Sequence, residues 1–357
     1  MDGLLDGKRI LITGGTGSLG KALLRTLLHG DYGRPAQVVV FSRDEAKQHE
    51  VRLAFRKLRA ATEEVIYEDF EQLLQFQIGD VRDFNSVARA VRKADVIVNA
   101  AALKQVPNCE YFPHEAVRTN VDGAENLVRA LETLEHTVET VVGVSTDKAC
   151  KPVNVMGMTK AIQERLLVQA NLRCPNTRFI CVRYGNVLAT RGSVIPLFLS
   201  QIGSGGPVTI TDPAMTRFLL SLDRAVKTIM DAYRDAGRGE IFIPRIPSSL
   251  ITNVAQALIG ERRIAIANTG IRPGEKVHEI LVSEDEGFRT EIRKDYYVIR
   301  PVLAEIGATT PLQRALNGEY SSADHVMDLE ATQTLLRDNQ LMPDQIEGRR
   351  FFGELLQ

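Results

Sequence analysis

Length, composition and charge exclude several classes of protein. The chain has 357 residues, 44% hydrophobic and 25% charged, which is typical of a globular protein with more than one domain and not of a disordered, collagenous or coiled-coil chain. Because 44 Lys and Arg residues balance 45 Asp and Glu residues, no overall field draws the chain onto nucleic acid or an anionic membrane, so neither is expected as a partner.

The cysteines and histidines favour a metal-free protein of the reducing cytoplasm. The four cysteines show no C-x-x-C spacing and the six histidines no H-x-x-x-H spacing, so neither a zinc site nor a disulfide framework is predicted. The first ten residues carry acidic side chains where a signal peptide would be basic, which favours a cytoplasmic protein. The uncharged run 192–211 is broken by Pro and Gly, so we do not expect it to span a membrane.

Short apolar runs alternate with helical periodicity through the first half of the chain. The runs typical of strands buried on both faces are Lys8–Thr13, Gln37–Phe41, Asp95–Ala101, Thr140–Val144 and Phe179–Tyr184. This alternation predicts an α/β fold built on a Rossmann-type doubly wound parallel sheet. The charged stretch from Arg43 to Glu71 predicts a solvated helical segment.

A glycine cluster follows the first predicted strand and precedes an amphipathic helix. Its residues satisfy G-x-G-x-x-G, and those expected to bind a dinucleotide are Gly14, Thr16, Gly17, Ser18 and Gly20. Glycines allow the tight turn and the close approach of the backbone, and the helix N-terminus receives the pyrophosphate.

The end of the second predicted strand distinguishes NADP from NAD. A carboxylate there accepts a hydrogen bond from the ribose 2′-hydroxyl, whereas cations bind a 2′-phosphate. The chain has Ser42, Arg43 and Asp44 in a row, with Lys47 one turn later. Arg43 is a bidentate phosphate donor and Lys47 a point charge, so NADP is predicted, while Asp44 keeps NAD open.

The rhythm of strands and helices becomes irregular after Pro196. We therefore predict an NADP-binding Rossmann domain over 1–193, with a return strand near 240–260 indicated by the apolar run Glu240–Pro244. The ranges 194–239 and 261–357 are predicted to form a smaller C-terminal substrate-binding α/β domain.

Reactive side chains follow the strand Thr140–Val144, at the sheet edge where ligands bind in open α/β folds. They are Thr146, Asp147 and Lys148, and Met156 and Lys160 follow at a spacing that places both on one helix face.

A series of motifs runs in order through most of the chain. They are TGGTGSLG, FSRDEAKQ, GDVRD, NAAALKQVP, STDKACKPVNVMGMTK, VRYGNVLATRGSVIP, MTRFLLSL, GEIFIPRIPS, GIRPGEK and EYSS. Together they resemble the UDP-N-acetylglucosamine 4,6-dehydratases of the extended short-chain dehydrogenase/reductase superfamily, and the C-terminal motifs look most like the members that invert C5. Two departures stand out. Met156 replaces the tyrosine of the Y-x-x-x-K signature, and Arg56–Gln75 is longer than expected.

The resemblance implies an internal redox cycle. A hydride passes from C4 of the sugar to NADP+, the C6 hydroxyl leaves as water after the C5 proton is removed, and the hydride returns to C6. By resemblance Lys148 is the C5 base and Asp147 the C6 acid, and a lysine base requires a pKa lowered by burial or by cations. Because Met156 cannot titrate, the C4 proton is expected to go to Asp147 or to a water held by Thr146 and Lys160.

The resemblance also assigns further binding residues. Besides the glycine loop and the Ser42 region, those expected to contact the cofactor are Asp80, Val81, Ala100, Ala101, Lys160 and Tyr184. Those expected to contact UDP-N-acetylglucosamine are Lys104, Asn186, Arg191, Ser193, Val194, Thr209, Arg217, Arg272 and Glu275. Arg217 and Arg272 would grip the diphosphate with their guanidinium groups. A homo-oligomer is expected, because such enzymes commonly form one.

Two other functions compete with a dehydratase of surface-glycan synthesis. A UDP-hexose 4-epimerase would share the fold and cofactor but needs no C6 acid and normally uses the missing tyrosine. A catalytically silent NADP-binding regulatory protein would account for Met156, but Asp147, Lys148 and Lys160 all remain in place.

Overall fold

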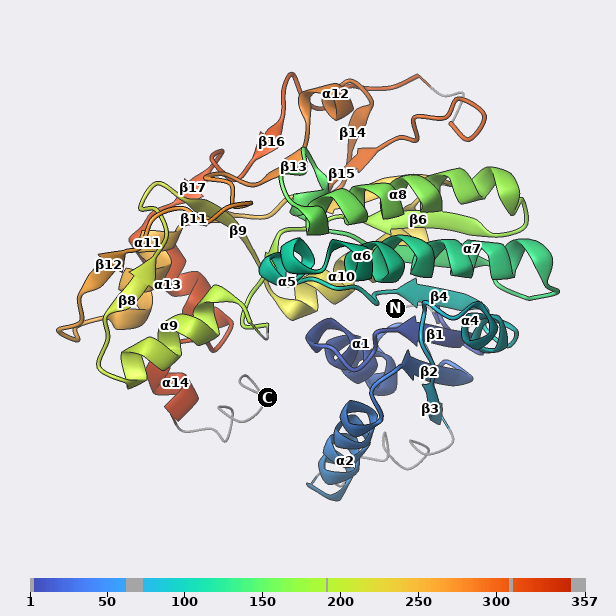
Figure 1. The fold of residues 1–357 in the computed structure, drawn as a ribbon, viewed down its shortest axis with the longest axis horizontal. Coiled ribbons are helices and arrows are strands. Elements are labelled where there is room, and N and C mark those ends of the chain that lie inside the picture. The colour runs from blue at the N-terminus through green and yellow to red at the C-terminus, as the bar shows by residue number, and fades with distance from the viewer. Residues whose placement is uncertain (1–2, 62–72, 191, 308–310, 348–357) are drawn as a thin grey trace.

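A nine-stranded sheet forms the centre of the molecule (Figure 1). The computed structural model describes residues 3–61, 73–190, 192–307 and 311–347. The strand order of the sheet is β14-β15-β10-β6-β5-β4-β1-β2-β3. These strands are β1 (Arg9–Thr13), β2 (Gln37–Ser42), β3 (Leu74–Ile78), β4 (Val96–Asn99), β5 (Thr140–Val144), β6 (Arg178–Val182), β10 (Ile241–Pro244), β14 (Thr290–Arg293) and β15 (Tyr296–Ile299).

The sheet is parallel from β3 to β10, and β15 and β14 are added antiparallel at one edge. The predicted Rossmann-type doubly wound sheet is therefore confirmed. Strand β1 lies between β2 and β4, so the chain order reverses there and the carboxyl ends of β1 and β4 border a crevice.

Helices cover both faces of this sheet. Helices α4, α7 and α8 pack in a row on one face, and α1 and α10 pack against each other on the opposite face (Figure 1). The helices of this part are α1 (Ser18–His29), α2 (Glu45–Ala61), α4 (Phe84–Val91), α5 (Val106–Tyr111), α6 (Pro113–Ala116), the π-helix η2 (Val117–Asp122), α7 (Gly123–Thr133), the 3₁₀-helix η3 (Asp147–Ala149), α8 (Val155–Arg173) and α10 (Leu222–Asp235).

Three smaller sheets and five helices lie beside the large sheet, on the left and at the top of Figure 1. The sheets are β17-β11-β9-β7, β12-β8 and β13-β16. Their strands are β7 (Asn186–Val187), β8 (Val208–Ile210), β9 (Thr216–Leu220), β11 (Ser248–Leu250), β12 (Ile266–Asn268), β13 (Ile280–Val282), β16 (Tyr320–Ser321) and β17 (Val326–Met327). The helices are α9 (Val194–Gly203), α11 (Ile251–Ile259), α12 (Glu284–Gly287), α13 (Leu329–Asp338) and α14 (Pro343–Glu347).

Two main clusters of buried apolar side chains form the core. One lines both faces of the large sheet and extends to β9, β13 and β16, and the other joins α9, α11 and α13. The chain crosses between the parts more than once. Strand β10 returns to the large sheet, and so do β14 and β15, which lie in the range 261–357 that the sequence predicts for the smaller domain. Among the described residues, no helix is long and apolar enough to cross a membrane.

Candidate active site

The glycine loop after β1 is shaped for close contact with a ligand. Gly14 has φ +69°, and a Cβ at this position would lie 2.8 Å from Ala101 Cα. A Cβ at Gly20 would lie 2.3 Å from the Gly15 carbonyl oxygen, so α1 packs tightly against the loop. Gly17 precedes the first turn of α1 and provides no side-chain cap, which leaves the helix amides for an anion. Thr16 and Ser18 flank Gly17, both partly exposed.

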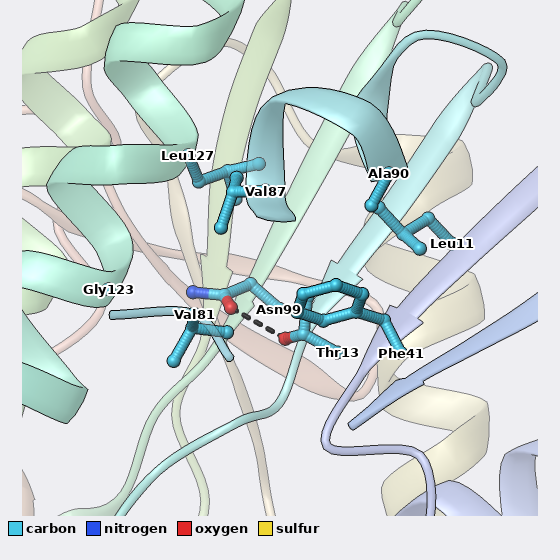
Figure 2. A pocket seen from close by; sticks show the side chains of 9 residues that line it. All are labelled: Leu11, Thr13, Phe41, Val81, Val87, Ala90, Asn99, Gly123 and Leu127. Carbon is cyan, nitrogen blue, oxygen red and sulfur yellow. Dashed lines mark hydrogen bonds between the residues drawn. The ribbon is translucent and has the colours of Figure 1, made fainter. Parts of the chain in front are cut away.

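Thr13 fixes the β4 loop beside the glycine loop. Its Oγ1 donates to Asn99 Oδ1 (2.7 Å) and accepts from the Ala101 amide (3.2 Å), while its carbonyl oxygen accepts from the Ala100 amide (3.2 Å). Figure 2 shows the Thr13–Asn99 bond at the edge of a small cavity among apolar side chains. The cavity measures about 10 Å³, room for one water at most, so it is a packing void and not a ligand site.

The residues after β2 give Asp44 a structural role. Asp44 Oδ1 accepts from the Lys47 amide (3.0 Å) at the start of α2, and Asp44 Oδ2 pairs with Lys47 Nζ (2.7 Å). Ser42 Oγ accepts from the buried Gln48 amide group (3.0 Å). Arg43 is exposed. The Asp44 carboxylate is thus engaged with Lys47, and the positive charge of Arg43 helps to lower the pKa of Asp80.

Asp80 and Val81 follow β3. Asp80 Oδ2 pairs with Arg82 (2.6 Å), and although burial alone would raise the pKa of Asp80, Arg82 lowers it overall. The carbonyl oxygen of Val81 accepts from Asn126 Nδ2 (3.0 Å), which fixes this turn against α7.

The residues after β5 form a buried ionic cluster. Lys148 Nζ lies 3.0 Å from Asp147 Oδ1 and 3.2 Å from Glu279 Oε1, and Thr146 Oγ1 also donates to Asp147 Oδ1 (2.9 Å). The side chains of Asp147 and Glu279 are 0% and 4% exposed, and that of Lys148 is 21% exposed. Lys148 is therefore the member of the cluster that reaches solvent.

Burial and nearby charges shift the pKa values of the two carboxyl groups in opposite directions. Burial, assisted by the negative charge of Glu279, raises the pKa of Asp147 despite the opposing effect of Lys148. Burial alone would also raise the pKa of Glu279, but Lys148, Arg217 and Lys276 lower it overall. Of the two carboxyl groups, Asp147 therefore has the greater tendency to hold a proton and Glu279 the greater tendency to lose one.

The pKa of Lys148 is raised, whereas its predicted role as a base requires a lowered pKa. Burial alone would lower this pKa, as a resting lysine base requires, but the charges of Asp147 and Glu279 outweigh burial and raise it. The expectation of a lowered pKa is wrong for this arrangement, because two carboxyl groups face one ammonium group. Lys148 is protonated at rest.

Met156 and Lys160 lie at the start of α8. Met156 is buried in an apolar cluster with Cys109 and Ala116. Lys160 Nζ donates to the Val144 carbonyl oxygen (2.6 Å) and to Gln163 Oε1 (2.6 Å), and burial lowers its pKa to about 8.

Several buried polar atoms have no hydrogen-bond partner within the described ranges. Besides Asp147 Oδ2 and Glu279 Oε2, they are the side-chain oxygens of Thr119, Ser145, Tyr184, Asn186 and Ser193. Buried polar groups are normally paired, so a group of unpaired ones marks a place for a polar ligand. Tyr184, Asn186 and Ser193 were expected in the site, whereas Ser145 and Thr119 were not.

The remaining predicted substrate residues come from both parts of the molecule. Thr209 Oγ1 accepts from Gln201 (2.7 Å), and Val194 begins α9. Lys104, on the loop before α5, is exposed, as is Arg272, whose amide and carbonyl groups bond to Glu275 within one turn. Arg191 lies outside the described residues.

Arg217 is engaged within the protein. Its guanidinium donates to the carbonyl oxygens of Thr216 (2.7 Å), Val277 (3.0 Å) and Lys276 (3.0 Å). Arg217 therefore fixes the segment that leads to Glu279, in addition to any contact with a diphosphate.

Two buried residues, Glu279 and Asn120, are not among those predicted from the sequence. Glu279 directly follows the motif GIRPGEK, in the sequence VHE. Asn120, in the π-helix η2, bonds through Oδ1 to the Leu103 amide (2.8 Å) and through Nδ2 to Thr159 Oγ1 (2.9 Å), so it joins the Lys104 loop to α8. A π-helical turn is a frequent sign of a functional site, but sequence periodicity does not reveal it.

Comparisons with known proteins show the family to which the chain is related. Residues 10–301 match the family described as polysaccharide biosynthesis protein. The chain is 43% identical over 297 residues to the UDP-glucose 4-epimerase of Rickettsia conorii, covering 82% of each chain. It is 42% identical over 301 residues to the UDP-N-acetylglucosamine 4,6-dehydratase (inverting) of Campylobacter jejuni, covering 84% of each chain. The solved structure of Pen from Bacillus thuringiensis matches with a TM-score of 0.84 at 34% identity, over 95% of this chain and 99% of that one.

Proposed function

The chain belongs to the polysaccharide biosynthesis protein family, and we propose that it is an NADP-dependent UDP-N-acetylglucosamine 4,6-dehydratase that inverts C5. The product would be UDP-2-acetamido-2,6-dideoxy-β-L-arabino-hexos-4-ulose, and the enzyme a hydro-lyase. The similarity to the Campylobacter dehydratase and the motifs around Asp147 support this proposal. A cytoplasmic homo-oligomer in surface-glycan synthesis is part of the same proposal.

The observation that carries the proposal is the buried acid Asp147. Its side chain is inaccessible to solvent, and its pKa is raised chiefly by burial. A carboxyl group whose pKa is raised has a greater tendency to hold a proton, which it can donate to the departing C6 hydroxyl. A 4-epimerase has no such leaving group and therefore no use for this acid.

The other two proton transfers fall to the lysines. Lys148 is exposed enough to reach the sugar, and it becomes the C5 base after its ammonium proton passes to solvent. Because Asp147 is assigned to donate a proton at C6, we assign the proton of the C4 hydroxyl to a different group. A water held by Thr146 and Lys160 is then the better acceptor, because the pKa of Lys160 is lowered to about 8.

The residues present fit a dinucleotide. Gly14 leaves room where a Cβ would clash with Ala101, and the open first turn of α1 suits a pyrophosphate. Arg43 with Ser42 and Lys47 would bind a 2′-phosphate, while Asp80, Val81, Ala100, Ala101, Lys160 and Tyr184 would line the rest. NADP bound there would accept a hydride and return it.

For the substrate, we propose that Arg272 and Arg217 face the diphosphate, with Glu275 ordering the Arg272 turn. Lys104, Asn186, Ser193, Val194 and Thr209 would line the sugar and the nucleotide. Arg191 is included from its motif alone.

A UDP-hexose 4-epimerase is the second candidate, because the Rickettsia relative, named as a UDP-glucose 4-epimerase, is about as similar to this chain as the Campylobacter dehydratase is. Incubation with UDP-N-acetylglucosamine and mass spectrometry separates the readings. Loss of one water supports the dehydratase, a new isomer of unchanged mass supports the epimerase, and an unchanged sugar supports an NADP-binding protein without catalysis.

A further inference from the structure

Glu279 brings a second carboxyl group to Lys148 from a distant part of the chain. Asp147 and Lys148 follow β5 of the large sheet, whereas Glu279 directly precedes β13 of the smaller part. The two carboxyl groups lie 3.0 and 3.2 Å from the same Nζ atom. We propose that Glu279 is a positioning residue of the active site, which fixes the ammonium group of Lys148 and places a negative charge beside Asp147. The inference rests on the proposed dehydratase function.

The backbone of Glu279 is held from two sides. Its amide donates to Ser322 Oγ (2.9 Å), and its carbonyl oxygen accepts from the Ser322 amide (2.8 Å). Ser322 Oγ in turn donates to the Thr216 carbonyl oxygen (3.2 Å) and lies 2.7 Å from Thr216 Oγ1. The carboxyl group is thus aimed at Lys148 by β9 and by the segment that follows β16.

The side chain of Glu279 is not arranged as a purely structural ion pair would be. One oxygen pairs with Lys148, but Oε2 is buried without a hydrogen-bond partner among the residues described. Leaving such an oxygen unpaired is costly, so a structural pair would normally satisfy it. The same holds for Asp147 Oδ2. Each carboxyl group therefore keeps one oxygen for a task other than binding Lys148.

The charged groups near Glu279 come from several elements. Lys148 and Asp147 face it from η3, Arg217 from β9, and Lys276 from the segment before β13. The neighbouring His278 ring bonds through Nδ1 to Thr216 Oγ1 (2.8 Å). Removing the negative charge of Glu279 lowers the proton affinity of both Asp147 and Lys148, because a nearby carboxylate stabilises their protonated forms.

The test is the pH dependence of dehydration in Glu279→Gln. Turnover requires a protonated Asp147 and a Lys148 that can give up its proton, so both limbs of the kcat profile move in the same direction. We expect the profile to shift toward acid by roughly 1–3 pH units, with a kcat at the wild-type optimum at least about tenfold lower. Glu279→Asp keeps the charge but shortens the reach, so it should retain the wild-type optimum and lose kcat.

Glu284→Gln is the matched control, because it removes an exposed carboxylate from α12 that pairs only with Lys151 among the described residues. Its profile should match that of wild type. Coincident profiles for Glu279→Gln and wild type would overturn the inference, as would a Glu279→Asp variant with wild-type kcat.

A second readout does not depend on turnover. In protein labelled with 13C at lysine Cε, the Lys148 resonance, assigned through Lys148→Arg, reports the titration of its ammonium group. It should titrate at lower pH in Glu279→Gln than in wild type, and equal titrations would overturn the inference. A wild-type protein that fails to dehydrate UDP-N-acetylglucosamine would refute the proposed function, while this titration would still decide the role of Glu279.

Discussion

Replacing Asp147 with asparagine removes its ability to donate a proton while keeping most of its hydrogen bonds. Asp147 Oδ1 accepts from Thr146 Oγ1 (2.9 Å) and Lys148 Nζ (3.0 Å), and an asparagine carbonyl oxygen keeps both bonds. The amide nitrogen takes the place of Oδ2, which has no partner within the described part of the chain, at a cost of about 1–3 kcal/mol. Since 1 kcal/mol shifts Tm by about 2–4 °C in domains of 150–250 residues, Tm should fall by less than about 12 °C.

The pH dependence of this stability difference has a definite sign. Because burial raises the pKa of Asp147, its protonated form stabilises the fold, fully below the unfolded-state pKa of about 3.9 and progressively less as the pH rises through the folded-state pKa. Above that pH the wild type carries a buried carboxylate that Asp147→Asn lacks. The gap in Tm between the two proteins should therefore narrow as the pH rises.

The dehydration activity of Asp147→Asn should fall far more than its stability. An amide cannot supply the C6 proton, so dehydration should fall by about 10²–10⁴-fold, or roughly 3–5 kcal/mol of transition-state stabilisation. Product formation from UDP-N-acetylglucosamine measures the rate, and thermal unfolding followed by circular dichroism measures Tm. Asp295→Asn, at a side chain 76% exposed, is the control and should behave as wild type. An Asp147→Asn variant that dehydrates at close to the wild-type rate would refute the reasoning.

Three further predictions concern cofactor binding and stability. Gly14→Ala and Gly7→Ala both place a Cβ on a residue with φ near +70°, at a strain of about 1–2 kcal/mol. Only at Gly14 would the Cβ clash with backbone atoms, so titration calorimetry should show loss of NADP binding in Gly14→Ala and not in Gly7→Ala. Arg43→Ala should weaken NADP binding by about ten- to a hundredfold and leave NAD binding nearly unchanged, and equal losses for both cofactors would contradict the assignment. Arg183→Met should destabilise the fold by about 3–5 kcal/mol in urea unfolding, because it removes the buried cation that Glu164 and Glu286 share; an unchanged midpoint would count against this.

The local part of the fold could be predicted from the sequence. Strands β1, β2 and β5 and the glycine loop were predicted nearly at their observed bounds, because apolar runs buried on both faces and a glycine fingerprint are local signals. Strand β3 was missed, since its sequence LQFQI alternates apolar and polar residues next to a charged segment. The place of β14 and β15 in the large sheet depends on pairing with β10, which no local pattern reveals.

The residues of the candidate site likewise include some that local motifs predict and some that they do not. Asp147, Lys148 and Lys160 could be found from motifs, since they follow a predicted strand or lie on the helix after it. Glu279 could not, because it reaches Lys148 only through the packing of β13 and Ser322. Together with the charge of the adjacent Asp147, the charge of Glu279 raises the pKa of Lys148 where burial alone would lower it.

The most direct test of the central claim is the reaction of the protein with UDP-N-acetylglucosamine and NADP in D2O, followed by mass spectrometry and proton NMR. A C5-inverting dehydratase should release one water, take up solvent deuterium at C5, and transfer the C4 hydrogen to C6 without exchange, with ring couplings of the L-arabino 4-ketone. Early and exclusive formation of the D-xylo sugar would contradict inversion alone. A product of unchanged mass with its configuration altered at C4, or a sugar that does not react, would contradict the dehydratase itself.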